Sequence, residues 1–365
     1  MRTTIGLCGV LAMLLSTPVQ AQTPCTFDPG CTEPTAVIVT PDGQYLYVAC
    51  GSGDITRVRL SDHTVVNTIT VGYDPHHLAI SPDGEHLFAT NTVDGYYTTK
   101  ISTATDSIEC TIPGYTDPSG IAITPDGDTA IIVANWTGIL QGVPVDACAA
   151  SYTIGGLGAG CIDVVVTPDG KYAYATSTTN PVPWGVFKVD LKARQVVDTL
   201  PAGLGGLDIT PDGALLFVTN SNWSNYVYVV STAADSVIDS IHVGNGCEDV
   251  KVSPDGLYAY VSHYGGDSVA VLSVADRSVI AILPVGQSPR WLAISPDGIR
   301  IFVPNYNSNC ITEFTRSCVW APVAPPCVDR KADINCDTVE DVFDVIYLID
   351  YVFSGGPPRV LCPQE

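Results

Sequence analysis

Basic residues are scarce in this chain. Its 365 residues include 16 Lys and Arg against 38 Asp and Glu, which gives a formal net charge of −22 at pH 7. Proteins that bind nucleic acids or anionic lipid surfaces use patches of Lys and Arg to neutralise the negative charge. The composition therefore argues against a nucleic-acid or membrane-surface partner. It leaves proteins, glycans, small molecules and cations as possible partners.

Known catalytic signatures are also missing. The sequence has no Gly-x-Ser-x-Gly nucleophile motif, no His-Glu-x-x-His metal motif and no paired-Cys haem site. These absences favour a binding or scaffold protein over an enzyme. Disorder is excluded by composition, because 46% of the residues are hydrophobic and only 15% are charged.

Long apolar segments are absent except at the N-terminus. Residues 1–21 combine a positive charge at Arg2, a short apolar run and a small-residue cleavage pattern that ends at Ala21. This is typical of a secretory signal peptide, and the run is well short of the ~20 residues that span a bilayer. We expect an extracellular, periplasmic or cell-surface protein with no membrane span.

Twelve of the 13 cysteines follow this segment. An even number of cysteines in an exported protein favours disulfides over free thiols. The short spacings Cys25/Cys31 and Cys310/Cys318 allow local bridges. The sequence does not fix the pairing.

A four-residue motif, Thr/Ser-Pro-Asp-Gly, occurs seven times at intervals of 41 to 43 residues. It begins at Thr40, Ser81, Thr124, Thr167, Thr210, Ser253 and Ser295. Pro, Asp and Gly together favour a chain reversal, and alternating apolar stretches flank each motif. Four short strands in each of seven repeats predict an all-β fold, a seven-bladed β-propeller of four-stranded antiparallel blades over residues 22–320.

Uniform positions in the repeat are interpreted as core. The seventh residue after the first residue of the motif is Ile131 in the third repeat and a large ring in the other six, which are Tyr47, Phe88, Tyr174, Phe217, Tyr260 and Phe302. We expect these side chains to pack between neighbouring blades. The outermost strand of the last blade is expected from residues 318–323 or from the N-terminal residues near Cys25. Cys161 and Cys247 occupy equivalent places in two repeats, and a bridge between them is one of the pairings that the sequence leaves open.

The repeats at residues 71–91 and 285–305, VGYDPHHLAISPDGEHLFATN and VGQSPRWLAISPDGIRIFVPN, resemble the YVTN family of β-propeller repeats. The resemblance recurs seven times over residues 32–320 and implies the seven-bladed fold. Many members of this family lack an assigned reaction, so the resemblance does not define a function.

Candidate functional residues are those that depart from the repeat where the central funnel opens. In a propeller, the segment leading into the first strand of each blade and the loop leaving the second strand share that face. The residues that depart from the repeat at these places are His76, His77, Asp163, Glu248, Asp249, His263, Arg290 and Trp291.

Several kinds of site are open to these residues. His and carboxylate groups suit a divalent metal in the funnel or acid–base chemistry. Arg290 with Trp291 suits an anionic or sugar-like ligand. The alternative to a ligand site is that these polar side chains are exposed to solvent and bind nothing.

The C-terminal residues have a different pattern. A Pro-rich linker, residues 321–332, precedes a stretch with oxygen-bearing side chains at positions 1, 3, 5, 9 and 12, which are Asp333, Asn335, Asp337, Asp341 and Asp344. Val339 at position 7 offers its backbone carbonyl. This spacing predicts an EF-hand-type calcium loop.

Helical spacing follows the loop up to the Gly355-Gly356 stop, and residues 359–365 form a short tail. Loop and helix, residues 333–358, resemble one repeat of a type I dockerin, which implies calcium as a cofactor. A dockerin that binds cohesin normally has two repeats. A single repeat with Thr338 in place of the usual Gly leaves a cohesin-like partner in doubt.

These observations favour a secreted or cell-surface binding or scaffold protein. Its propeller funnel or face would bind a surface protein, a glycan or a small ligand, and its calcium-stabilised tail would serve attachment or assembly. The rival is a propeller enzyme of the lactonase or lyase type with a metal or His/carboxylate site in the funnel. A third hypothesis is a structural spacer within a surface layer.

Overall fold

The computed structural model describes residues 25–316, apart from residues 73, 93–95, 115–116, 179–184 and 221–224. The predicted signal peptide, the linker, the calcium loop with its helix and Cys318 lie outside the described residues.

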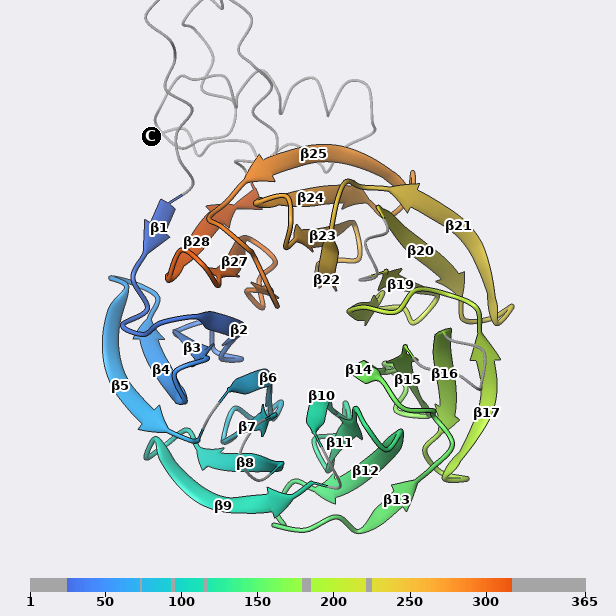
Figure 1. The fold of residues 1–365 in the computed structure, drawn as a ribbon, viewed down its shortest axis with the longest axis horizontal. Coiled ribbons are helices and arrows are strands. Elements are labelled where there is room, and N and C mark those ends of the chain that lie inside the picture. Colours follow the sequence, from blue (N-terminus) through green and yellow to red (C-terminus); the bar gives the residue numbers. More distant parts are fainter. Residues whose placement is uncertain are drawn as a thin grey trace, which may run out of the picture.

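Seven four-stranded antiparallel sheets surround a central axis, and one edge strand of each sheet lies nearest that axis (Figure 1). The prediction of a seven-bladed propeller is confirmed, and no helix occurs among the residues that the structure describes. We number the sheets as blades 1 to 7 in chain order.

The first four blades each use four consecutive strands, ordered from the axis outward. Blade 1 contains β2 (Pro34–Val39), β3 (Tyr45–Cys50), β4 (Asp54–Arg59) and β5 (Thr64–Thr70). Blade 2 contains β6 (Pro75–Ile80), β7 (His86–Asn91), β8 (Tyr97–Ser102) and β9 (Ser107–Pro113). Blade 3 contains β10 (Pro118–Ile123), β11 (Thr129–Ala134), β12 (Ile139–Pro144) and β13 (Tyr152–Ile154). Blade 4 contains β14 (Cys161–Val166), β15 (Tyr172–Ser177), β16 (Gly185–Asp190) and β17 (Gln195–Leu200).

The remaining blades have the same outward order. Blade 5 contains β18 (Leu207–Ile209), β19 (Leu215–Thr219), β20 (Tyr226–Ser231) and β21 (Ser236–His242). Blade 6 contains β22 (Cys247–Val252), β23 (Tyr258–His263), β24 (Ser268–Ser273) and β25 (Ser278–Pro284). Blade 7 contains β26 (Ala293–Ile294), β27 (Arg300–Asn305), β28 (Cys310–Thr315) and β1 (Cys25–Phe27).

Blade 7 is completed by the N-terminal strand. β1 pairs with β28 so that Cys25 lies opposite Glu313 and Phe27 opposite Ile311. This decides between the two strands expected from the sequence, in favour of the residues near Cys25. The two ends of the ring are thereby held in one sheet, which leaves no unpaired strand at the seam.

The repeated motif folds as the turn between the first two strands of each blade. In blade 1 the Thr40 hydroxyl donates to Asp42 Oδ1 at 2.5 Å, and the same oxygen accepts the Gln44 N–H at 3.0 Å. Gly43 has a φ of +70°, a conformation that glycine adopts without steric strain. The motif residues therefore serve the turn.

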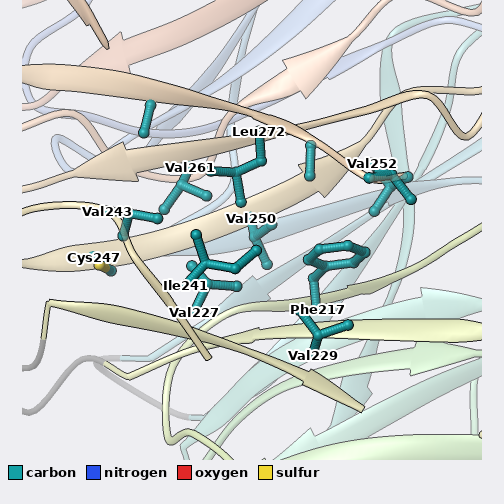
Figure 2. Packing of buried hydrophobic residues seen from close by; sticks show 13 residues of the cluster. Phe217, Val227, Val229, Ile241, Val243, Cys247, Val250, Val252, Val261 and Leu272 are labelled. Atoms are coloured by element: carbon teal, nitrogen blue, oxygen red, sulfur yellow. The ribbon is translucent and has the colours of Figure 1, made fainter. Parts of the chain in front are cut away.

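The large side chains of the repeat are buried between blades. Each of the six predicted rings has a relative exposure of at most 1%, and Ile131 is fully buried. Phe217 lies in a cluster with Val227 and Val229 of blade 5 and with Val250 and Leu272 of blade 6 (Figure 2). Because such clusters cross from one blade to the next, their burial holds the ring together.

Two disulfides form among the described residues, Cys31–Cys50 and Cys110–Cys148. The local bridge between Cys25 and Cys31 that their spacing allowed does not form, because Cys31 is bonded to Cys50 at the end of β3. Disulfides are typical of exported proteins. No helix of the described part of the chain is long and apolar enough to cross a membrane.

The bridge between Cys161 and Cys247, which the sequence left open, does not form. Both thiols are free and buried, and they lie in separate apolar clusters. The Cys161 thiol donates to the Gly158 carbonyl at 3.4 Å, and the Cys247 thiol donates to the Gly244 carbonyl at 3.5 Å. Their equivalence in the repeat places them at the same level but with blade 5 between them.

Candidate functional site

The axis is lined by equivalent positions of the innermost strands. One such ring of positions lies four residues before the first residue of each motif, and it contains Ala36, His77, Gly120, Asp163, Gly206, Asp249 and Trp291. Four of these are predicted site residues. The repeat therefore brings His77, Asp163, Asp249 and Trp291 to one level.

Trp291 occupies much of the space at this level. Its indole is 4% exposed and packs with Ala36 and Ala49 of blade 1. A Cβ at Gly206 would lie 3.0 Å from Trp291 Cζ3 and 2.7 Å from Asp249 Oδ1. Because Gly206 of blade 5 has no side chain, the indole of Trp291 in blade 7 can lie in this space.

His76 and His77 face this indole from blade 2. Their Nδ1 atoms are 2.8 Å apart, and the His77 ring centre lies 4.0 Å from that of Trp291. Burial, with a contribution from Arg290, lowers the pKa of His76 to about 4. Burial, with contributions from His76 and Lys251, lowers the pKa of His77 well below its usual value. Both imidazoles are therefore neutral near pH 7.

Three aspartates tie consecutive blades together. One oxygen of each accepts a backbone N–H from the next blade, in its innermost strand or directly before it. Asp163 accepts from Leu207 at 3.2 Å, Asp208 from Val252 at 2.7 Å and Asp249 from Leu292 at 3.0 Å. These bonds satisfy buried carboxylates and fix blades 4 to 7 at the axis.

Lys251 is the counter-ion of this group. Its Nζ lies 3.0 Å from Asp249 Oδ1 and 4.0 Å from Asp163 Oδ2. Burial opposes its charge, but Asp249, Asp163 and Asp208 outweigh burial and raise the pKa of Lys251 above its usual value. Burial, opposed by Lys251 and reinforced by Asp163, raises the pKa of Asp249 to about 7. Burial also raises the pKa values of Asp163 and Asp208.

Lys251 and Asp208 were missed at the level of sequence, although a signal for them exists. Both stand two residues before the first residue of the motif. The other five repeats have an apolar residue there, which is Ile38, Ala79, Ala122, Val165 or Ala293. A charged residue at this position, which is apolar in the other repeats, therefore indicates the axial site.

Glu248 and Arg290 lie one residue further out, with His76. Arg290 Nη1 is 3.6 Å from Glu248 Oε1, and its Cζ lies 4.9 Å from the Tyr264 ring centre and 4.6 Å from that of Tyr306. Burial raises the pKa of Glu248, and Arg290 opposes this shift. The buried Nε of Arg290 has no hydrogen-bond partner.

His263 is the predicted site residue that does not join either group. It lies at the end of β23, where its Nδ1 is 3.0 Å from the Ser268 hydroxyl. Burial lowers its pKa to about 4. Its side chain does not line the cavity on the axis.

This cavity of about 110 Å³ lies on the axis, because residues of all seven blades line it. His77, Asp163, Asp208, Lys251 and Trp291 supply its polar lining. Two buried atoms of these side chains, His77 Nε2 and Trp291 Nε1, have no hydrogen-bond partner. His77 Nε2 lies 3.9 Å from Asp163 Oδ1, too far for a direct hydrogen bond.

Metal binding is not evident from the geometry of the described residues, in which no three His, Cys, Asp or Glu side chains come together to hold an ion. The divalent metal expected in the funnel stays a prediction.

Comparison with protein families supports the fold. A model described as lactonase, seven-bladed β-propeller, matches residues 158–319, which is less than half of the chain. The matched part runs from blade 4 to blade 7 and includes Asp163, Asp208, Lys251 and Trp291. The chain is a seven-bladed propeller.

Comparison with individual proteins adds two relatives. An uncharacterized WD repeat-containing protein, sll1491 of Synechocystis sp., is 37% identical over 105 residues, which cover 27% of this chain and 28% of that protein. A chain of hydrazine synthase from Kuenenia stuttgartiensis superposes with a TM-score of 0.71 and 22% identity, covering 83% of this chain and 98% of that chain. At this identity the likeness concerns the fold alone.

Proposed function

We propose that this chain is an exported binding protein whose axial cavity holds a small, uncharged, hydroxyl-bearing ligand, either a polyol or the end of a sugar. The observation that carries the proposal is the pair of unpartnered buried atoms, His77 Nε2 and Trp291 Nε1, on side chains that line the cavity. An unsatisfied buried polar group costs about 1–3 kcal/mol, and a ligand with matching donors and acceptors removes that cost.

Charge favours a neutral ligand over an ion. An anion in the cavity would meet the carboxylates of Asp163 and Asp208, and a cation would meet the ammonium of Lys251. The Trp291 N–H is a donor only, whereas the neutral His77 Nε2 donates or accepts according to its tautomer. A hydroxyl group both donates and accepts, so it satisfies either arrangement.

Size favours a small ligand among the three partner classes expected from the sequence. The cavity of about 110 Å³ has room for several water molecules, since one water needs at least ~10–15 Å³ of such space. That space suits a short polyol or a single hydroxymethyl end. A larger glycan would keep its remaining units outside the cavity.

Thermal unfolding in the presence of small ligands tests the proposal. Glycerol and erythritol at low millimolar concentration are compared with acetate and methylammonium, each against wild type and His77→Leu. A ligand that binds only the native state stabilises it by RT ln(1 + [L]/Kd), so the stabilisation grows with the logarithm of ligand concentration above Kd. We expect a rise in melting temperature that grows with the logarithm of polyol concentration, in wild type only. A rise with acetate or methylammonium alone, or an equal rise in His77→Leu, would contradict the proposal.

A lactone-opening hydrolase is the second candidate, favoured by the family match to residues 158–319. The linked pair His76 and His77, neutral near pH 7, supplies a base of the kind that activates water. Hydrolysis of a sugar-lactone panel in a pH-stat, with wild type and His76→Gln, tests this candidate. Turnover by wild type that His76→Gln reduces at least about a hundredfold, the usual contribution of a general base, would favour the enzyme.

The C-terminal residues 333–358 are proposed to bind calcium through Asp333, Asn335, Asp337, Asp341 and Asp344 and the carbonyl of Val339. The spacing of these residues supports the proposal. Calorimetric titration of the full chain with calcium, compared with the double variant Asp333→Asn/Asp337→Asn, tests it. Heat of binding in wild type that the double variant lacks is expected. Equal heat in both chains would contradict the assignment.

A further inference from the structure

A larger crevice lies away from the axis, between blades 4 and 5. Its volume is about 420 Å³, and its lining includes Asp169, Tyr172, Lys188, Asp212 and Thr232. Asp169 and Asp212 belong to the Pro-Asp-Gly turns of the two blades, so the crevice opens on the face that carries these turns. None of its residues belongs to the axial site.

The equivalent place between blades 6 and 7 is filled by the chain's own arginine. The guanidinium of Arg316 contacts the carboxylate of Asp255 through Nη1 and Oδ2. Its Cζ also lies 4.4 Å from the centre of the Tyr258 ring. A turn aspartate and a tyrosine together form the receptor for this guanidinium.

The repeat relates the two places residue by residue. Asp169 and Tyr172 hold the positions in blade 4 that Asp255 and Tyr258 hold in blade 6. The position of Arg316 is held by Thr232, because the N–H of Thr232 donates to the Ala214 carbonyl at 3.1 Å. In the same register the Arg316 N–H donates to the Ile299 carbonyl at 2.7 Å. A short side chain therefore stands where blade 7 has an arginine, and the crevice is left open.

The carboxylate of Asp169 accepts the same two hydrogen bonds within its turn as that of Asp255. Asp169 Oδ1 accepts the Thr167 hydroxyl at 2.6 Å and the Lys171 N–H at 3.0 Å. Asp255 Oδ1 accepts the Ser253 hydroxyl at 2.6 Å and the Leu257 N–H at 3.0 Å. In both turns Oδ2 is left for another partner.

Two lysines compete with an incoming cation for these groups, Lys188 in the lining of the crevice and Lys171 outside it. Lys171 Nζ lies 2.9 Å from Asp169 Oδ2, but the two side chains are 71% and 50% exposed, and such pairs are weak. Lys188 lies 4.6 Å from the centre of the Tyr172 ring, and its charge is compensated by Asp235 at 2.7 Å. Asp212 adds a further carboxylate to the lining. The crevice retains negative charge for an incoming cation.

We propose that this crevice binds the guanidinium of an arginine side chain presented by a basic peptide segment of a partner protein. Arginine fits better than lysine, because its planar fork pairs with a carboxylate while its face stacks on an aromatic ring. The net charge of −22 attracts such a segment at long range. Arg316 makes both of these contacts in the equivalent place between blades 6 and 7, with the carboxylate of Asp255 and the ring of Tyr258.

NMR titration of the isotope-labelled full chain with the tripeptide Gly-Arg-Gly tests the proposal at about 0.15 M salt, where long-range attraction is screened. Gly-Lys-Gly is the matched probe. We expect saturable shifts centred on Tyr172 and Thr232 with the arginine peptide, and several-fold weaker binding of the lysine peptide. Shifts spread evenly over the acidic turns, or equal affinity for the two peptides, would overturn the proposal.

Three variants and one control sharpen the test. Thr232→Arg supplies the side chain that fills the equivalent groove and is expected to abolish binding. Asp169→Asn keeps the turn oxygen and is expected to weaken binding about two- to fivefold. Lys171→Leu, the residue of blade 6, removes the competitor and is expected to tighten binding.

Asp126→Asn changes the same turn in blade 3, where Thr129 replaces the tyrosine, and it is expected to leave affinity unchanged. Binding that survives Thr232→Arg, or that falls equally in Asp169→Asn and Asp126→Asn, would contradict the assignment of the crevice.

Discussion

Lys251 Nζ lies 3.0 Å from Asp249 Oδ1 at the centre of the propeller. Asp163 and Asp208 stand near the same ammonium, and each of the three aspartates also holds a backbone N–H of the following blade. A single ammonium thus serves the three carboxyl groups that join blades 4 to 7. The axis of this ring is held by hydrogen bonds and charge, whereas the contacts between blades are apolar.

Replacement of Lys251 by Met should therefore destabilise the ring. Loss of the ammonium leaves buried carboxylates without a counter-ion, and breaking a buried ion pair typically costs several kcal/mol. We expect a loss of about 2–4 kcal/mol in the free energy of unfolding, measured by urea denaturation at pH 7. Lys171→Met, at an exposed pair, is the matched control and should be indistinguishable from wild type. Equal stability of Lys251→Met and wild type would contradict this role.

His263 should make the protein sensitive to acid. Its pKa is about 4 in the folded chain against 6.5 for the free side chain, so between these pH values the unfolded state binds more protons. Stability therefore falls as the pH decreases from 6.5 to 4, by about 2–3 kcal/mol from this residue. Blades 2 and 7 have Asn at the equivalent position, Asn91 and Asn305. The substitution His263→Asn should therefore be tolerated and should remove the acid-dependent loss of stability.

The measurement for His263 is the free energy of unfolding of wild type and His263→Asn at pH 8 and pH 4. The difference at pH 8, where the imidazole is neutral in both states, is the baseline. We expect the variant to gain on wild type as the pH falls. Parallel pH profiles would show that His263 titrates alike in the folded and unfolded chains.

The Cys31–Cys50 disulfide should stabilise the closure of the ring. It joins the segment after β1, the outer strand of blade 7, to the end of β3 in blade 1. A bridge that closes a loop of 19 residues contributes about 3 kcal/mol in chain-entropy terms. The double variant Cys31→Ser/Cys50→Ser should lose about that amount, and a reductant should lower the melting temperature of wild type more than that of the variant. An unchanged melting temperature in the double variant would argue that β1 pairing alone closes the ring.

The fold could be predicted because its signals are local and repeated. The turn needs Asp42 and Gly43 for reasons of hydrogen bonding and φ, and the same letters recur at every blade. The large rings could be assigned to the core from their fixed distance to the turn, and all of them are buried. Which strand closes blade 7 could not be chosen, since two segments fit and only the pairing of Cys25 with Glu313 distinguishes them.

The axial site could be predicted in part. Comparison of the repeats singled out His77, Asp163 and Trp291, which line the cavity. It also singled out His263, which lies apart because the end of the second strand does not reach the axis at this level. Lys251 could not be predicted from the segments that enter the first strand or leave the second, because it lies inside β22.

Disulfide pairing could not be deduced from equivalence in the repeat. Cys161 and Cys247 are equivalent, yet each thiol donates to a backbone carbonyl three residues before it. Equivalence fixes the level of a residue along the axis and leaves its distance across the ring undetermined.

The most direct test of the axial binding site follows the indole N–H signal of Trp291 by NMR while glycerol or erythritol is added. The signal is assigned by its loss in Trp291→Phe, and the indole of Trp136, on a residue that is 62% exposed, serves as the internal control. We predict a saturable shift of the Trp291 signal with the Trp136 signal unmoved. A Trp291 signal that stays in place with both polyols, or that moves in step with Trp136, would contradict the proposed site.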